Sequence, residues 1–123
     1  MSCLASKTRR VCATATGDYW TIPSRLHDPL LRIVQEALRN AVRHACATEI
    51  NVDLSCLDRD KVRIRICDNG CGFDLETAIR KPRHWGLANM REYAESTGAT
   101  FQVVTSPGRG TEVEITSRIS SET

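Results

Sequence analysis

The strongest constraint on the fold is an amphipathic pattern between Leu30 and Ala45. Its apolar residues recur at helical spacing and form one core-facing stripe: Leu30, Ile33, Val34, Ala37, Leu38, Ala41, Val42 and Ala45. The opposite face carries Arg32, Gln35 and Arg39. Asp28 suits a helix cap, and Pro29 suits the first helical position. We therefore expect the helix to begin at these two residues and to end near Cys46.

Three polar residues on this helix, Glu36, Asn40 and His44, occur four positions apart. Side chains at this spacing lean toward the same side of a helix. Asn40 and His44 fall beside the apolar stripe, where a polar group is costly to desolvate unless a ligand requires it. We interpret this side of the helix as a site for a nucleotide and its metal ion.

The composition is that of a soluble globular protein, and 123 residues suffice for one core. We expect one folded domain over residues 10–119, with flexible segments at 1–9 and 120–123. A net charge of +2 is too small to indicate binding to nucleic acid or to a membrane surface. No apolar run approaches the roughly 20 residues of a membrane span, and the N-terminus lacks the apolar core of a signal peptide. We expect a cytosolic protein, or the cytosolic part of something larger.

Six cysteines are scattered along the chain, at Cys3, Cys12, Cys46, Cys56, Cys67 and Cys71. They form no CxxC pair, so a zinc site is a minor alternative. We expect free and mostly buried thiols.

The rest of the pattern predicts a second helix and five strands. Residues 10–16 suit an edge strand, and residues 50–54 and 62–66 alternate as a hairpin whose second strand ends at Asp68. A helix fits residues 87–97, with Gly98 as its stop. Residues 101–105 and 111–117 read as two more strands. This order predicts an α+β, two-layer sandwich whose sheet is mixed but mostly antiparallel, with helices on one face.

Three glycine-containing segments interrupt this pattern, and each has an ordinary alternative. Residues 68–73, Asp-Asn-Gly-Cys-Gly-Phe, form a turn signal, or they bring backbone and a carboxylate close to a ligand. Such a carboxylate can accept a hydrogen bond from the amino group of adenine. Residues 108–111, Gly-Arg-Gly-Thr, form a hairpin turn, or they close over the base.

The third segment begins at Gly86 and opens a helix without a Ser, Thr or Asp cap. It is either a hinge or a helix end whose free N–H groups face phosphate oxygens. The cations before it form a surface loop or add positive charge over the phosphates: Arg80, Lys81, Arg83 and His84.

Together, in this order, the motifs resemble the ATP-binding catalytic domain of a bacterial sensor histidine kinase. This superfamily is shared with gyrase, heat-shock chaperone ATPases and mismatch-repair ATPases. Residues 36–45 match the asparagine box, and residues 68–73, 86–92 and 108–111 match the three glycine boxes. The Gly-Leu-x-x-Met-Arg-Glu form of the second glycine box resembles the subfamily of the nitrate sensors.

The resemblance implies a role for each residue at the phosphate end of the site. Glu36 would act near the γ-phosphate as a base or a hydrogen-bond organiser, and Asn40 would ligate Mg²⁺ through its carbonyl oxygen. Arg43 and His44 would approach the phosphates. Gly86 and Leu87 would open the helix that faces them.

At the base end, the resemblance implies that Asp68 binds the adenine amino group. Gly70 and Gly72 would let the backbone pass close by. In the third glycine box, Gly108 and Gly110 would close over the base, and Thr111 would assist there directly or through water.

The resemblance also implies partners. ATP and Mg²⁺ would be bound, and the γ-phosphoryl group would pass to a histidine on a separate dimerisation domain of the parent kinase and then, indirectly, to a response regulator. We expect this chain to be a monomeric fragment of a longer kinase, with little turnover alone, and the parent to be cytosolic or a membrane-bound sensor. His27-Asp28 resembles the phosphoacceptor pair of the subfamily. That pair normally lies well upstream, whereas His27 is only nine residues before Glu36, and Pro29 also indicates a helix start, so we do not assign it.

Two alternatives stay open at this stage. One is a serine kinase of the same superfamily that acts on an anti-sigma antagonist. The other is a nucleotide-binding or protein-interaction module without catalysis. A hydrolysing machine of the gyrase type is disfavoured, because it requires a catalytic lysine from a further domain.

Overall fold

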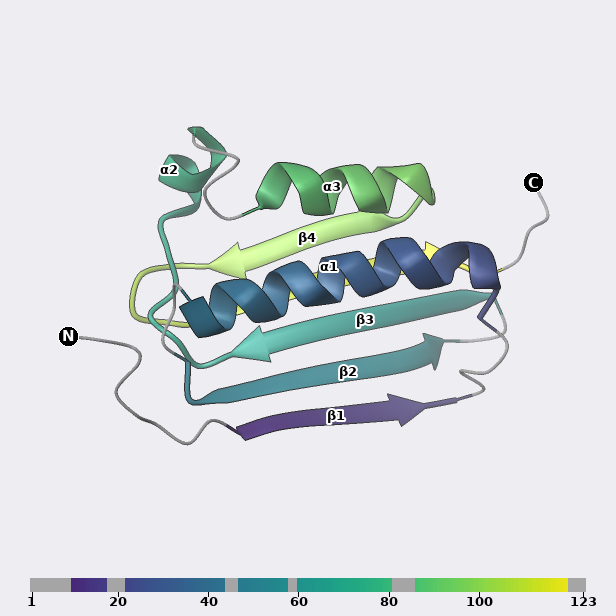
Figure 1. Ribbon diagram of the computed structural model, residues 1–123, viewed down its shortest axis with the longest axis horizontal. Helices are drawn as coiled ribbons and strands as arrows, with labels where there is room; N and C mark the ends of the chain where they lie inside the picture. The colour runs from purple at the N-terminus through teal and green to yellow at the C-terminus, as the bar shows by residue number, and fades with distance from the viewer. Residues whose placement is uncertain (1–9, 18–21, 44–46, 58–59, 81–85, 120–123) are drawn as a thin grey trace.

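The computed structural model describes residues 10–17, 22–43, 47–57, 60–80 and 86–119. The elements in chain order are β1 (Arg10–Thr16), α1 (Ser24–Arg43), β2 (Glu49–Leu57), β3 (Lys61–Asp68), α2 (Leu75–Arg80), α3 (Leu87–Ser96), β4 (Thr100–Thr105) and β5 (Thr111–Arg118). Figure 1 shows α1 lying across a five-stranded sheet, with α3 beside it over β4. This arrangement confirms the two-layer α+β class.

The sheet has the strand order β1-β2-β3-β5-β4. β1 pairs in parallel with β2, whereas every other pair in the described sheet is antiparallel. The mixed, mostly antiparallel sheet and the edge position of residues 10–16 are therefore confirmed. The β2–β3 hairpin is confirmed as well, with Val52 opposite Ile66 and Leu54 opposite Ile64. Asp68 is the last residue of β3, as the alternation predicted.

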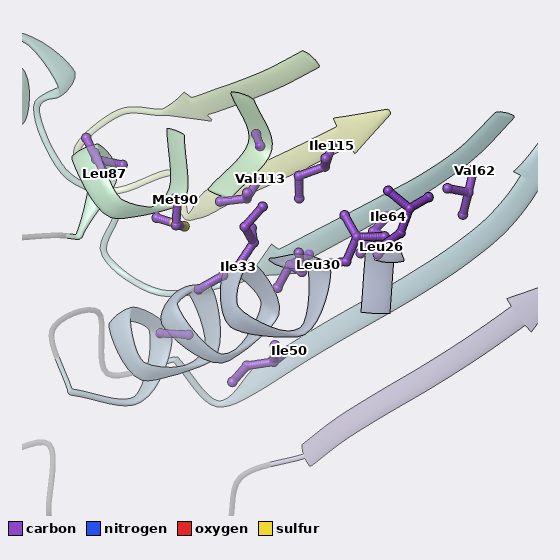
Figure 2. Packing of buried hydrophobic residues seen from close by; sticks show 14 of the residues in the cluster. Leu26, Leu30, Ile33, Ile50, Val62, Ile64, Leu87, Met90, Val113 and Ile115 are labelled. Atoms are coloured by element: carbon purple, nitrogen blue, oxygen red, sulfur yellow. The ribbon is translucent and has the colours of Figure 1, made fainter. Parts of the chain in front are cut away.

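The core lies between α1 and the sheet face that carries Val62, Ile64 and Ile66. Figure 2 shows Ile33 of α1 and Met90 of α3 within the same apolar cluster. The buried residues of α1 are Leu26, Leu30, Ile33, Ala37 and Ala41.

The stripe predicted for α1 is too wide. Val42 is 36% exposed, while Val34 and Leu38 are only partly buried against the core. Because the helix meets the sheet along one line, only its central row of side chains is covered. Ala45 lies outside the described residues. The polar face is exposed as expected, at Arg32, Gln35 and Arg39.

The predicted start of this helix is wrong, because α1 begins one turn earlier, at Ser24, and Pro29 lies inside it. A proline in a helix removes one backbone hydrogen bond. That loss is outweighed by tertiary contacts of the added turn, in which Leu26 is fully buried and Arg25 donates to the Ile119 carbonyl at 3.2 Å. The described helix ends at Arg43, and the predicted end near Cys46 lies outside the described residues.

The reason for setting His27 aside, that Pro29 marks a helix start, is therefore also wrong. His27 is exposed inside α1, and its Nε2 lies 3.0 Å from the Ile22 carbonyl oxygen.

The basic segment after residue 73 contains a helix that the sequence did not predict, α2. Asp74 precedes it and accepts hydrogen bonds from the Glu76 backbone at 3.3 Å and from the Thr77 hydroxyl at 2.9 Å. Six residues are too few to display a helical period, which explains the miss. By contrast α3, β4 and β5 lie where the pattern predicted them, and Gly98 follows α3 with a φ of 74°.

The described cysteines are free, but the prediction that they are mostly buried is wrong: Cys12 and Cys71 are exposed, and Cys56 and Cys67 are half-buried. Cys12, Cys56 and Cys67 lie on strands of a sheet that has one face open to solvent, and Cys71 lies in the loop after β3. Within the described ranges, no group of three or more His, Cys, Asp or Glu residues is arranged for a metal ion.

Among the described helices, none is both long and apolar enough to cross a membrane. The predicted features that fall on residues 1–9, 18–21, 44–46, 58–59, 81–85 and 120–123 lie outside the described part of the chain; they include the flexible ends, Cys3 and Cys46.

Candidate functional site

A cavity lies between α1, α3 and the sheet, where β3 ends and β5 begins. It brings together predicted site residues from four elements: Asn40 of α1, Asp68 of β3, Leu87 of α3 and Thr111 of β5. Its remaining lining is mostly apolar: Ala37, Ile66, Phe73, Met90, Val103 and Val113. Apolar walls with a few convergent polar groups are the kind of lining that small-molecule sites have.

Asp68 is the principal acceptor of this cavity. It pairs with Thr111 across β3 and β5, and its carboxylate accepts hydrogen bonds from the Thr111 backbone and, at 2.8 Å, from the Gly70 backbone. Burial raises the pKa of Asp68 above its usual value, and the two backbone hydrogen bonds oppose that shift. The two donors fix the carboxylate in place at the edge of the core.

The glycines beside Asp68 allow two loops to pack backbone against backbone. Gly72 has a φ of 65°, and a Cβ there would overlap the Ser106 carbonyl oxygen. Gly110 has a φ of 75°, and a Cβ there would overlap the Asp68 carbonyl oxygen. Gly108 lies at the exposed tip, where a Cβ would meet no atom within 4 Å. The close approach at Gly72 and Gly110 is therefore between the loops themselves, and it shapes the wall around Asp68.

Asn69 is a positioning residue that the sequence did not single out. Its Oδ1 accepts hydrogen bonds from the backbone of Thr48 and of Glu49, each at 2.9 Å, and its Nδ2 donates to the Thr48 hydroxyl at 3.0 Å. These bonds tie the loop after Asp68 to the start of β2. In the sequence, Asn-Gly is only a turn signal, and nothing in it indicates this long-range tether.

Thr105 is a second residue that the sequence did not single out. Its hydroxyl contacts the Phe73 backbone nitrogen at 3.1 Å, the Gly110 carbonyl at 3.1 Å and the Thr111 hydroxyl at 2.9 Å. Thr105 thus joins the loop after β3 to the loop before β5. In the sequence it appears only as the last residue of a strand.

Leu87, the first residue of α3, lines the cavity, so the N-terminus of that helix lies at the cavity wall. Gly86 precedes the helix with a φ of 68°, and no side chain of the described residues caps it. The Glu36 side chain of α1 lies against Gly86, because a Cβ at that glycine would overlap the Glu36 carboxylate. The free N–H groups of the helix end and the positive end of its dipole favour anions.

The structure does not bring every predicted residue to this cavity. Arg43 is exposed at the described end of α1, and Arg80 is exposed at the end of α2. Neither of them lines the cavity, and the same holds for these other predicted site residues: Glu36, Gly70, Gly72, Gly86, Gly108 and Gly110. His44, Lys81, Arg83 and His84 lie outside the described residues.

Comparisons with known proteins agree with this geometry. The family described as "Histidine kinase-, DNA gyrase B-, and HSP90-like ATPase" matches residues 26–121. Sensor protein VraS of Staphylococcus aureus (strain COL) is 40% identical over 101 residues, which cover 82% of this chain and 28% of VraS. VraS of Staphylococcus haemolyticus (strain JCSC1435) is 39% identical over 101 residues, with the same coverage. The chain therefore spans 28% of the length of these curated relatives.

Solved structures share the fold. The Erythrobacter litoralis EL346 blue-light activated histidine kinase superposes with a TM-score of 0.80 at 22% identity, covering 95% of this chain and 37% of that one. The histidine kinase domain from the same protein gives a TM-score of 0.77 at 23% identity, covering 93% of this chain and 53% of that one. The family match extends over most of the chain and confirms the resemblance seen in the four motifs. This chain therefore belongs to the family of histidine kinase-, DNA gyrase B- and HSP90-like ATPases.

Proposed function

We propose that this chain is the catalytic domain of a longer sensor histidine kinase. It binds ATP with Mg²⁺ and donates the γ-phosphoryl group to a histidine on the dimerisation domain of the parent protein. A response regulator receives that group in turn. The observation that carries the proposal is the convergence of Asn40, Asp68, Leu87 and Thr111 on one cavity. The similarity to VraS supports the kinase branch of the family.

The adenine ring binds between the apolar walls of the cavity, with its amino group at Asp68. Ile66, Met90 and Val113 are apolar and line the same cavity as that carboxylate. Apolar walls supply contact area, and one fixed acceptor supplies orientation. Gly70 and Gly72 act indirectly, since their backbone holds the loop around Asp68.

The phosphates bind toward Gly86 and Leu87, at the uncapped N-terminus of α3. Helix ends of this kind are well suited to phosphate, because N–H groups and the dipole act together. Glu36 reaches this end from α1 and takes part there as a base or a hydrogen-bond organiser. Arg43, exposed at the described end of the same helix, adds positive charge, and we assign the same role to His44, which lies outside the described residues.

The residues fit a magnesium ion held mainly by the nucleotide. Asn40 lines the cavity and supplies an amide oxygen, which is a suitable ligand for this hard cation. Since the described residues form no cluster of three or more His, Cys, Asp or Glu, the other ligands come from phosphate and water. The ion neutralises charge on the phosphate oxygens during transfer.

The transfer breaks the bond between the γ-phosphorus and the oxygen that bridges it to the β-phosphate. A bond from phosphorus to an imidazole nitrogen forms, and ADP leaves. Phosphoryl transfer depends mainly on positioning and on charge neutralisation. Since the acceptor histidine belongs to another domain, this chain alone binds nucleotide as a monomer and turns it over slowly. We expect it to act in the cytosol.

Two experiments test the proposal. Calorimetry with ATP and MgCl₂ should detect binding, and its absence would favour a protein-interaction module. Labelled ATP should then be offered with a histidine-bearing dimerisation domain or with a serine-bearing protein of the anti-sigma antagonist type. Acid-labile label on the first supports the histidine kinase, whereas acid-stable label on the second supports the serine kinase.

A further inference from the structure

The hydroxyl group of Thr105 has three polar neighbours, and their chemistry fixes where each proton lies. The Phe73 N–H points to Thr105 Oγ1 with an N–O distance of 3.1 Å, so it occupies one lone pair of that oxygen. The Gly110 carbonyl oxygen lies 3.1 Å away and can only accept a hydrogen bond. The third neighbour is Thr111 Oγ1 at 2.9 Å.

A threonine hydroxyl has one proton and two lone pairs. The single proton of Thr105 must go to the Gly110 carbonyl, because otherwise two oxygen atoms would face each other with no proton between them. The second lone pair of Thr105 is then the acceptor for the hydroxyl of Thr111. The proton of Thr111 is therefore committed to Thr105. Toward any other group, Thr111 Oγ1 presents only its lone pairs, so it can accept a hydrogen bond but cannot donate one.

Thr111 lines the base cavity together with Asp68, and the two residues face each other across β3 and β5. Once the Thr111 proton is committed, both side chains are hydrogen-bond acceptors. A purine with an amino group can donate to such a pair, but a purine with a carbonyl group at the same position cannot. Both side chains are half-buried, and an acceptor shielded from water that faces another acceptor discriminates between such ligands.

We propose that Thr105 is a specificity-determining positioning residue: it fixes Thr111 as an acceptor and so makes the base site select an amino purine, such as adenine, over an oxo purine, such as guanine. This inference rests on the proposed nucleotide site and extends it to a residue that does not itself line the cavity.

The test compares the affinities of ATP and GTP, each with MgCl₂, by calorimetry. Thr105→Val keeps the side-chain shape but removes the acceptor, so the Thr111 hydroxyl is free to turn and donate. The preference for ATP over GTP should fall about tenfold or more, in keeping with the loss of one hydrogen-bond constraint. Thr105→Ser retains the hydroxyl and should keep the preference of the unaltered protein.

Thr100→Val is the matched control. Thr100 is at the other end of β4 and is exposed, and its hydroxyl donates to the Thr116 carbonyl at 3.4 Å. This variant should leave both affinities unchanged. General loosening of the fold would weaken ATP and GTP equally, so the ratio of the two affinities separates orientation from stability.

An unchanged ATP-to-GTP ratio in a folded Thr105→Val protein would overturn the inference. If that variant does not fold, Thr111→Val provides the second test, because it removes the acceptor itself and should lower the same ratio. An unchanged ratio in Thr111→Val would also overturn the inference. If the unaltered protein binds neither nucleotide, the proposed function fails and this inference fails with it; if it binds ATP without preference over GTP, only the inference fails.

Discussion

The carboxylate of Glu36 lies directly against the backbone of Gly86. The two residues belong to α1 and to the N-terminus of α3, and a Cβ at position 86 would overlap the Glu36 side chain. Glycine is thus favoured at this position on two grounds, since its φ of 68° also lies in the left-handed region. The pair sets how closely α1 approaches the helix end that we assign to the phosphates.

Gly86→Ala should therefore be more destabilising than Gly98→Ala. Gly98 has a similar φ of 74°, but a Cβ there meets nothing within 4 Å. Gly98→Ala should lower the free energy of unfolding by about 1–2 kcal/mol, the cost of a left-handed backbone. Gly86→Ala should lower it further, because the Glu36 side chain must move. Urea unfolding of both variants measures the difference.

A double variant identifies the cause of that difference. In a Glu36→Ala background the added methyl group has room, so the excess cost of Gly86→Ala should largely disappear. In a Glu36→Gln background it should persist, since glutamine has the same shape. Equal costs for the two glycine variants in the unaltered background would show that Glu36 and Gly86 are not in contact.

Asp68→Asn should weaken ATP binding without lowering the stability of the fold. Burial raises the pKa of Asp68 in the folded protein, so the free energy of unfolding decreases as the pH rises from the unfolded value of the pKa through the folded value. At neutral pH the ionised carboxylate therefore opposes folding, and Asn should give an equal or higher melting temperature. ATP affinity should fall about 10- to 100-fold with loss of the charged acceptor.

Thermal unfolding from below pH 3.8, the ordinary pKa of the carboxyl group, up to pH 8 and calorimetry at pH 7 measure these two effects. A melting temperature at pH 7 clearly below that of the unaltered protein would contradict the stability argument. Unchanged ATP affinity would instead contradict the assignment of Asp68 to the base.

Asn40→Ala should remove the magnesium dependence of nucleotide binding. With MgCl₂ present, ATP affinity should fall about tenfold or more, because one ligand of a hard cation is lost. With a chelator in place of the metal, the variant and the unaltered protein should bind alike. Gln35→Ala is the matched control, since Gln35 is exposed on the polar face of the same helix. Calorimetry of the three proteins in the two buffers measures these affinities, and an equal loss without metal would argue against Asn40 as a ligand.

Thr14→Val should loosen the edge strand β1. The Thr14 hydroxyl donates to Asp53 Oδ1 at 2.6 Å, directly across the β1–β2 pair. This bond and that of Ser55 lower the pKa of Asp53. A lowered pKa contributes stability above the unfolded value, and that stability is lost as the pH falls through the folded value. The variant should therefore speed amide exchange in β1 near pH 7, and the effect should fade in acid.

Thr16→Val is the control for this strand, because Thr16 is an exposed threonine of β1 that lies opposite Ser55. Equally fast exchange in both variants would indicate a general effect of valine on the strand edge rather than loss of the bond to Asp53.

The sequence predicts those structural features whose signals come from neighbouring residues, and it misses those that depend on contacts between distant residues. The alternation of apolar and polar residues correctly predicted β2 and β3 and the position of Asp68 at the end of β3. It did so because every second side chain of a half-buried strand is buried. The order of the asparagine and glycine boxes predicted four of the residues that line the cavity, Asn40, Asp68, Leu87 and Thr111, whereas their roles stay a prediction. The start of α1 was not predictable from Pro29, since the burial of Leu26 is a tertiary contact.

The same limit applies to Asn69 and Thr105. Asn69 makes hydrogen bonds to Thr48 and Glu49, and Thr105 accepts one from Phe73; these partners are distant in sequence, and the residue types at these positions do not signal such bonds. From the sequence, we also predicted that the glycines of the glycine boxes bring the backbone close to a ligand. At Gly72 and Gly110 the described neighbour is another loop of the same chain.

The pairing of Asp68 with Thr111 has a consequence for how the protein is made. The two residues join strands that are separated in the chain by α2, α3 and β4. Ribosomal synthesis therefore delivers Asp68 well before its partner, and long-range pairings of this kind form late in folding. On the proposed function, ATP shields the finished domain from proteases, because a ligand stabilises only the state that binds it. A nascent chain that stops short of β5 gains no such protection.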